Sequence, residues 1–313
     1  MITLSKLAKI AHVSLSTASK AFSMSNEVNE KTREEIFKIA KEYGVFRKFY
    51  NSKYSKWIIA VICPELTSNF YTEHLCKIHR YLKEYECEII VAVTNFSKEK
   101  CDELLNYYEK HTSVDGVISL TSINKSSVSE LPVVCLNELS NTDHFSNGLD
   151  QMVKYFKSKN VSDIGFLGES LTNSKKVAFE NVLRKNGLEL ESKNVYISKN
   201  RFEKAGFDGM NYLLSLPAFP RAVLCAYDHI AIGAMRAISE RGLNVPNDVA
   251  VVGMDNISMS EFLSPSLASI DSSVDFKCKS LVDNIINKLN GNEINLPEEP
   301  PSTFVLRESA KID

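Results

Sequence analysis

The feature that most constrains the fold is a regular alternation of apolar runs with amphipathic helical stretches, which begins at Trp57. The first block of this pattern covers 57–63, 70–84, 88–93, 98–110 and 116–120. A second block repeats the pattern from Ile164 to Met254. Because strands separated by helices form parallel sheets covered on both faces, the pattern predicts an α/β body of two Rossmann-like lobes. Ligands of such sheets bind beyond the carboxyl ends of the strands, so the cleft between the lobes is the expected pocket.

Charge is segregated along the chain, although the net charge is only −2. Residues 1–56 contain eleven Lys or Arg residues and five Glu residues, a balance of +6, which leaves −8 for residues 57–313. A basic head on an acidic body is typical of a protein that binds a polyanion such as nucleic acid through the head. A small domain with a solvated basic face is the alternative that charge alone leaves open.

Three short helices are predicted in the basic head. From Leu4, apolar residues recur at the i, i+3, i+4 and i+7 positions of one helical face. Ser14 is a suitable N-cap for a second helix that runs to about Phe22, and Asn29 for a third helix that ends at Gly44. Two short helices separated by a three-residue turn indicate a helix-turn-helix.

The second helix carries the predicted base contacts, because its N-terminal part enters the major groove in a helix-turn-helix. Leu15, Ser16 and Lys20 point away from the expected core. Leu can touch a thymine methyl, Lys can donate to guanine, and Ser can bond to either kind of base. The other candidate DNA-binding residues, mainly for phosphate, are Ser14, Thr17, Ser19 and Lys6. A helical module that binds another protein is the alternative.

Several classes of protein lack support in the sequence. No stretch approaches the roughly eighteen apolar residues of a membrane span, and the N-terminus lacks the apolar run of a signal peptide, so we expect a cytoplasmic protein. The seven cysteines are at least eleven residues apart and form neither a zinc knuckle nor a CxxC pair. GxGxxG, GxxxxGK[ST] and HExxH motifs are absent from the sequence. We therefore expect no metal, no cofactor and no enzymatic activity.

The head resembles that of the lactose-repressor (LacI/GalR) family. The resemblance rests on Leu7-Ala8-x-x-Ala11-x-Val13-Ser14-x-x-Thr17-Ala18-Ser19-Lys20 and on Val28-x-x-Lys31-Thr32-Arg33. It implies a transcriptional regulator, and in most cases a repressor, whose operator binding is controlled by a small-molecule effector. One head contacts too few base pairs for specificity, so we expect a homodimer that reads a near-palindromic operator.

The body resembles the periplasmic-binding-protein-like effector domain of the same family. The matching segments are Ser68-Asn69-Phe70-Tyr71, Val114-Asp115-Gly116-Val117-Ile118, Ala226-Tyr227-Asp228, Val245-Pro246-x-Asp248 through Asp255, and Val305-x-Arg307-Glu308-Ser309. The resemblance implies that Asp255 and Lys175 bind hydroxyl groups of the effector. Asp255 could instead cap a helix after its strand.

The remaining effector candidates are polar or aromatic residues in the matching segments and at one further position: Ser68, Asn69, Phe70, Phe202, Tyr227 and Asp228. A carboxylate accepts from sugar hydroxyls, a cation donates to them and a ring stacks on C–H groups, so we expect a sugar or sugar phosphate. Lys175 supplies a point charge where the family usually has Arg, which is compatible with an acidic effector. Phe70 and Phe202 could instead be core aromatics, and Asp228 could orient a helix start.

We divide the chain into a DNA-binding domain (1–44), a hinge (45–56) and an effector-binding and dimerisation domain (57–313). The hinge departs from the family pattern, because it lacks both Pro and Leu. Its candidate DNA contacts are Arg47, Lys48, Lys53 and Tyr54, and we predict a weakly helical or disordered linker. The competing hypothesis is a cytoplasmic sugar-binding or sugar-processing protein whose basic head binds another partner.

Overall fold

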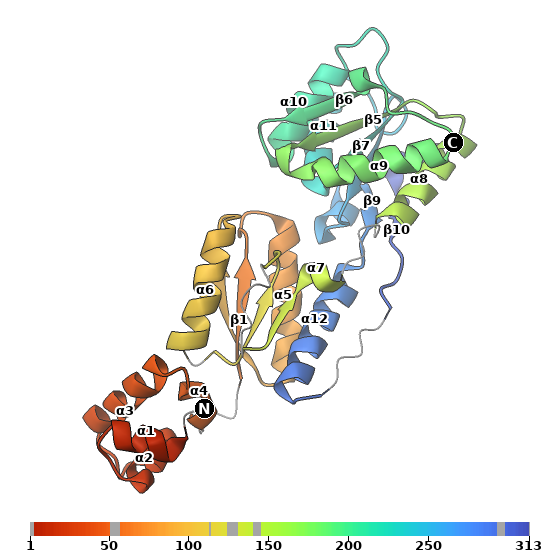
Figure 1. The fold of residues 1–313 in the computed structure, drawn as a ribbon. Coiled ribbons are helices and arrows are strands. Elements are labelled where there is room, and N and C mark those ends of the chain that lie inside the picture. The colour runs from red at the N-terminus through yellow and green to blue at the C-terminus, as the bar shows by residue number, and fades with distance from the viewer. Residues whose placement is uncertain are drawn as a thin grey trace. The chain divides into compact units, whose positions relative to one another are not determined.

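A computed structural model describes residues 3–50, 57–112, 114–123, 131–139, 145–292 and 298–312 of the 313-residue chain. The chain forms two compact units (Figure 1). Unit 1 comprises Met1–Leu139 and Lys277–Pro297, and unit 2 comprises Ser140–Phe276 and Glu298–Asp313. Each unit contains one sheet, so the predicted α/β body of two lobes is confirmed.

The N-terminal head contains the three predicted helices. They are α1 (Leu4–Ile10), α2 (Leu15–Phe22) and α3 (Glu30–Glu42). The predicted caps of the second and third helices are confirmed, because Ser14 Oγ accepts from Thr17 N at 3.0 Å and Asn29 Oδ1 accepts from Thr32 N at 2.8 Å. Each cap satisfies an amide that would otherwise lack a partner in the first helical turn.

The head extends beyond the predicted boundary at residue 44, because a fourth helix, α4 (Phe46–Phe49), packs against the other three. Phe46 is buried, and its ring centre lies 4.9 Å from that of Phe37 and 4.7 Å from that of Tyr50. The aromatic side chains at the i, i+3 and i+4 positions of this segment give it one apolar face. The first six residues of the predicted hinge therefore belong to the head. Arg47 and Lys48 lie in α4, whereas Lys53 and Tyr54 lie outside the described residues.

Unit 1 contains a parallel sheet with the strand order β2-β1-β3-β4. Its strands are β1 (Ile58–Cys63), β2 (Glu88–Val93), β3 (Gly116–Ser119) and β4 (Val133–Cys135). The accompanying helices are α5 (Asn69–Glu84), α6 (Lys98–His111), α7 (Leu136–Leu139) and the part of α12 (Val274–Leu289) that belongs to this unit. β1 and β3 are buried, whereas the edge strand β2 is largely exposed.

Unit 2 contains a sheet with the order β10-β9-β8-β7-β5-β6, in which β10 alone runs antiparallel to its neighbour. Its strands are β5 (Ile164–Glu169), β6 (Val195–Ser198), β7 (Ala222–Cys225), β8 (Ala250–Met254), β9 (Ala268–Asp271) and β10 (Thr303–Val305). Its helices are α8 (Ser146–Ser158), α9 (Asn173–Lys185), α10 (Phe202–Leu213) and α11 (Asp228–Glu240), with short 3₁₀ turns η1 (Ser170–Thr172), η2 (Ser192–Asn194), η3 (Ser258–Phe262) and η4 (Glu308–Ala310).

Helices α10 and α11 cross at two glycines, which lets their backbones touch. A Cβ atom on Gly206 would lie 1.8 Å from Ile230 O, and one on Gly233 would lie 1.8 Å from Glu203 O. No side chain fits at either crossing point. The close crossing places the first turn of α10 beside the first turn of α11, and both turns follow strands at the carboxyl edge of the sheet.

Candidate functional sites on the head and at the sheet edges

The exposed face of α2 is the candidate DNA-binding surface. Leu15, Ser16 and Ser19 are exposed, while Ala18 on the same helix is fully buried in the head. Lys20 is half-exposed and forms an ion pair with the exposed Glu27. The predicted base-contacting side chains are thus accessible, and one of them has an acidic partner in the free head.

The predicted phosphate contacts lie close to the start of the same helix. Thr17 Oγ1 lies 2.8 Å from Ser14 Oγ, so the two hydroxyls share a hydrogen bond at the N-cap. Lys6 is exposed on α1. The helix N-terminus and these groups favour an anion, because unpaired amides and the helix dipole both point there.

The candidate effector site of unit 2 lies at the carboxyl edge of its sheet. Strands β8, β7, β5 and β6 are neighbours and parallel, so the residues that end or follow them share one edge. In strand order these residues are Asp255, Tyr227, Glu169 and Arg201. The chain leaves β5 for β6 on one side and returns to β7 on the other. Such a reversal of strand order is the place where open α/β sheets bind ligands.

Lys175 and Asp255, both predicted to bind an effector, contact each other. Lys175 Nζ donates to Asp255 Oδ1 at 2.8 Å and to Ala226 O at 2.9 Å. The side chains are 17% and 6% exposed. Nζ also lies 5.1 Å from the ring centre of Phe145 and 6.0 Å from that of Tyr227. Asp255 therefore pairs with a largely buried cation instead of capping a helix, and two aromatic rings lie near that cation.

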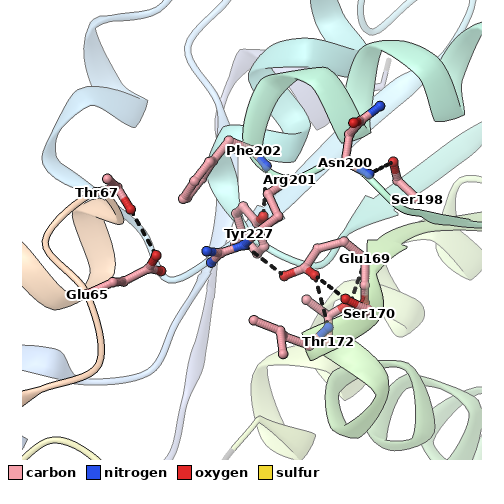
Figure 2. Close-up of polar contacts among 11 residues, drawn as sticks. Glu65, Thr67, Glu169, Ser170, Thr172, Ser198, Asn200, Arg201, Phe202 and Tyr227 are labelled. Atoms are coloured by element: carbon pink, nitrogen blue, oxygen red, sulfur yellow. Dashed lines mark hydrogen bonds and ion pairs between the residues drawn. The ribbon is translucent and has the colours of Figure 1, made fainter. Parts of the chain in front are cut away.

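Tyr227 and Phe202 lie together at the starts of α11 and α10 (Figure 2). The backbone N of Phe202 donates to Tyr227 Oη at 2.9 Å, and the two ring centres are 6.1 Å apart. Phe202 is partly exposed and has a φ of 57°, a left-handed conformation that is rare for a residue with a bulky side chain. The hydrogen bond from its backbone N to Tyr227 thus fixes Phe202 at this edge, where it is partly exposed.

Glu169 and Arg201 complete the edge, and neither was predicted from the sequence as a site residue. Glu169 Oε2 accepts from Leu171 N at 2.9 Å, which caps η1, and Glu169 Oε1 lies 3.8 Å from Arg201 Nε (Figure 2). Arg201 follows the turn at the end of β6, where Asn200 N donates to Ser198 Oγ at 2.9 Å. Only Glu169 had a positional signal, because it follows the apolar run that opens the second predicted block at Ile164; no strand was predicted before Arg201.

Asp228 has a structural role that does not fit the predicted effector contact. Its side chain is fully buried and accepts from Ser269 Oγ at 2.6 Å, from Ser260 Oγ at 2.8 Å and from Ile257 N at 2.8 Å. Burial raises the pKa of the carboxyl group from 3.8 to about 7. With both oxygens engaged inside the protein, Asp228 presents no face to a ligand. Asp228 anchors the loop after β8. This is a structural role at the start of a helix, in line with the alternative stated for it above.

The residues predicted in unit 1 lie beside the carboxyl end of β1. Ser68 precedes the first turn of α5, and Asn69 and Phe70 form that turn; all three are partly exposed. The ring centre of Phe70 lies 4.3 Å from that of His74. Glu65, which was not predicted, is buried nearby and accepts from Thr67 Oγ1 at 2.8 Å (Figure 2). This edge therefore offers polar groups and one partly exposed ring.

Comparison with known proteins places this architecture. Residues 153–310 match the model of the periplasmic binding protein-like domain family. The chain is 28% identical over 299 residues to the probable HTH-type transcriptional repressor ExuR of Bacillus subtilis, with 86% of each chain covered. It is 26% identical to the ribose operon repressor of Haemophilus influenzae, over 99% of this chain and 98% of the relative. The solved structure of the lac repressor dimer bound to operator and the anti-inducer ONPF has a TM-score of 0.71 at 21% identity and 98% coverage of both chains.

A helix-turn-helix head followed by two α/β sheets of this kind defines a DNA-binding regulator with a periplasmic-binding-protein-like body. The chain belongs to the LacI/GalR family of transcriptional regulators. Like these relatives, it is a transcriptional repressor, and it is not an enzyme. Within the described ranges, no helix is both long and apolar enough to cross a membrane.

Proposed function

We propose that this repressor binds a near-palindromic operator as a homodimer through α2, and that a sugar or sugar phosphate bound at the carboxyl edges of its sheets controls that binding. The observation that carries the proposal is the largely buried Lys175–Asp255 pair, whose cation lies near two aromatic rings at the reversal of strand order. Such a pair offers a hydroxyl-rich ligand both a donor and an acceptor next to ring faces. Residues 3–50 form the DNA-binding head in this proposal, and residues 57–313 bind the effector and the second subunit.

A thermal-shift screen of sugars, sugar phosphates and nucleosides tests the effector class. A ligand present at a hundred times its Kd stabilises the protein by about 2.7 kcal/mol. We expect a polyhydroxylated compound to raise the melting temperature of wild type and to leave that of Asp255→Asn unchanged. Stabilisation by compounds without hydroxyl groups alone would contradict the proposed ligand class.

On the head, we expect Lys20→Ala to weaken the preference for one operator base pair by about 1–3 kcal/mol. Lys20 must leave Glu27 to reach a base, but an exposed ion pair of this kind is worth only about 0–1 kcal/mol. Binding of operator variants, measured by fluorescence anisotropy, gives the base preference. Glu27→Ala is the control and should retain the preference of wild type.

Lys6→Ala should behave differently from Lys20→Ala. If Lys6 neutralises a phosphate, its loss weakens binding to all sequences alike and reduces the slope of log affinity against log salt by about 1. Equal losses on operator and random DNA for Lys20→Ala would assign that residue to phosphate and exclude base reading.

Exposed apolar side chains support the proposed homodimer. On unit 1 they lie along the edge strand β2, at Ile90, Val91 and Val93. Phe262 in η3 of unit 2 is 79% exposed. The residues directly after it line a groove of about 400 Å³, and the main apolar lining residues are Ile232, Met235, Leu243, Val245, Leu263 and Pro265. A projecting ring beside a groove that contains apolar side chains suits a two-fold interface, in which each subunit inserts its ring into the groove of the other.

We expect Phe262→Asp to raise the dissociation constant of the dimer at least a hundredfold, because a buried apolar anchor becomes a charge. Sedimentation velocity across a concentration series measures this change. Leu171→Asp is the matched control, since Leu171 is also exposed but lies in η1, away from the groove residues in sequence. A dimer that tolerates Phe262→Asp as well as Leu171→Asp would place the interface elsewhere.

A further inference from the structure

The loop that carries Asp255 has an uncommon backbone conformation. Asp255 and Asn256, the two residues after β8, have φ values of 93° and 48°. Asp and Asn adopt positive φ more readily than most residues, but such conformations persist only where the surrounding structure enforces them. The rotamers open to a side chain depend on its backbone angles. The groups that hold this loop therefore decide where the Asp255 carboxylate lies.

The main chain of the loop is bonded to the neighbouring strand β9. Asp255 N donates to Ile270 O at 2.9 Å, and Asn256 N donates to Ser269 Oγ at 3.0 Å. Ser269 Oγ in turn donates to the buried carboxylate of Asp228 at 2.6 Å. Both residues with positive φ thus have their amides held from β9.

The side chain of Asn256 lies between two groups of opposite charge. Arg307 Nη2 donates to Asn256 Oδ1 at 2.9 Å, and Asn256 Nδ2 donates to Asp271 Oδ2 at 3.0 Å. A cation beside the amide oxygen and a carboxylate beside the amide nitrogen allow one orientation of the amide. Both partners are held in turn. Arg307 Nη1 donates to Leu267 O at 2.7 Å. Ser273 N donates to the other oxygen of Asp271, Oδ1, at 2.7 Å.

We propose that Asn256 is a positioning residue for effector binding, which together with Asp271 and Arg307 holds the Asp255 carboxylate where it meets both Lys175 and the ligand. The inference rests on the proposed function, in which Asp255 contacts the effector. Binding groups must be held within about 0.5 Å of their productive position. Without the two side-chain bonds of Asn256, the loop can relax from its positive φ values, and the carboxylate moves away from the ligand.

Exchange of the amide and the carboxylate tests this role. Asn256→Asp sets a second carboxylate against Asp271 Oδ2. Asp271→Asn also breaks the arrangement, because Ser273 N and Asn256 Nδ2 donate to different oxygens and one of these becomes an NH₂ group. The double variant restores the bond in the reverse direction, since the amide now at position 271 donates to the carboxylate now at position 256. The net charge of the double variant equals that of wild type.

Isothermal titration calorimetry on full-length protein gives the sugar affinity. The probes are D-ribose, D-glucose, D-galactose, the 5-phosphate of ribose and the 6-phosphates of both hexoses, and the probe that wild type binds most tightly is used for the variants. We expect each single variant to raise Kd about tenfold or more, and the double variant to return to within about threefold of wild type. A purely structural role would lower the melting temperatures of the single variants without changing the Kd of the folded protein.

Asn256→Gly covers the case in which a single variant fails to fold. Gly adopts positive φ without steric cost, so this variant keeps the backbone of the loop while it removes both side-chain bonds. We expect its melting temperature to stay close to that of wild type and its Kd to rise about tenfold or more.

Asn186→Asp is the matched control. Asn186 Nδ2 donates to Asp150 Oδ1 at 2.8 Å, so this variant also sets two carboxylates against each other within unit 2. Asn186 lies at the opposite end of α9 from Lys175. We therefore expect its Kd to match that of wild type.

Two results would overturn the inference and leave the proposed function standing. One is a wild-type Kd in the single variants and in Asn256→Gly. The other is a double variant that binds the sugar no better than the single variants do. Failure of wild type to bind any of the probes would have a different meaning, because it would reject the sugar effector of the proposed function, and this inference with it.

Discussion

Asp228→Ala is expected to lower the free energy of unfolding by about 3–5 kcal/mol, because it leaves three buried donors without an acceptor. The donors are Ser269 Oγ, Ser260 Oγ and Ile257 N, all within 2.8 Å of a carboxylate oxygen. They belong to the loop after β8 and to β9, so the substitution should loosen the segment that begins with Asp255. Urea denaturation followed by far-UV circular dichroism measures the loss.

Asp228→Asn is the matched variant, because it keeps the size of the side chain and one acceptor while removing the charge. The pKa of Asp228 is about 7 in the folded protein and 3.8 when exposed, so the folded state binds the proton more tightly. The stability that this carboxyl group contributes is complete below pH 4 and is lost as pH rises through 7. We expect wild type to lose stability over this window relative to Asp228→Asn, measured as the difference between their urea midpoints. A constant difference from pH 4 to pH 8 would contradict the raised pKa.

Lys175→Met should cost a similar amount, about 3–5 kcal/mol, because it leaves the buried carboxylate of Asp255 without its cation. The same substitution should abolish the response to effector, since it removes a donor from the site. Unfolding by urea and the thermal shift on adding ligand give the two readouts. Lys204→Met is the control. Lys204 is exposed and pairs with Asp208, one turn further along the same helix, so losing this ion pair should cost less than about 0.5 kcal/mol.

The double variant Lys175→Met with Asp255→Leu separates stability from function. Replacing both members of a buried ion pair by apolar residues is often neutral or stabilising, so the free energy of unfolding should recover most of the single-variant loss. The ligand response should remain absent. Recovery of both properties would show that the pair supports the fold and takes no part in recognition.

Much of the fold could be predicted from the sequence, because its periodicities are strong. The alternation of apolar runs and amphipathic helices gave the two sheets, and Ser14 and Asn29 marked the helix starts of the head. The end of the head could not be placed in the same way. Phe46 and Tyr50 flank the basic pair Arg47-Lys48 shortly after Gly44, a context that suggested a linker, and only their packing against α3 shows that they complete the core.

The site was harder to predict, since it depends on which side chains meet at one edge. Lys175 and Asp255 are eighty positions apart, and the family resemblance suggested each of them but gave no sign that they pair. Glu169 ends an apolar strand and reads as an ordinary helix cap, so its contact with Arg201 appears only in three dimensions. Asp228 was predicted to contact the effector but is buried inside unit 2. The sequence does not distinguish a buried structural aspartate from one that binds a ligand.

The central claim is that a ligand at the carboxyl edge controls operator binding by the head. Its most direct test is the affinity of full-length protein for an operator duplex, selected from random sequences, with and without the sugar that stabilises wild type. We predict that the sugar changes the operator affinity of wild type at least tenfold, and that Asp255→Asn binds the operator as wild type does but no longer responds. An Asp255→Asn protein that still responds fully, or that loses operator binding while keeping its affinity for the sugar, would contradict the account.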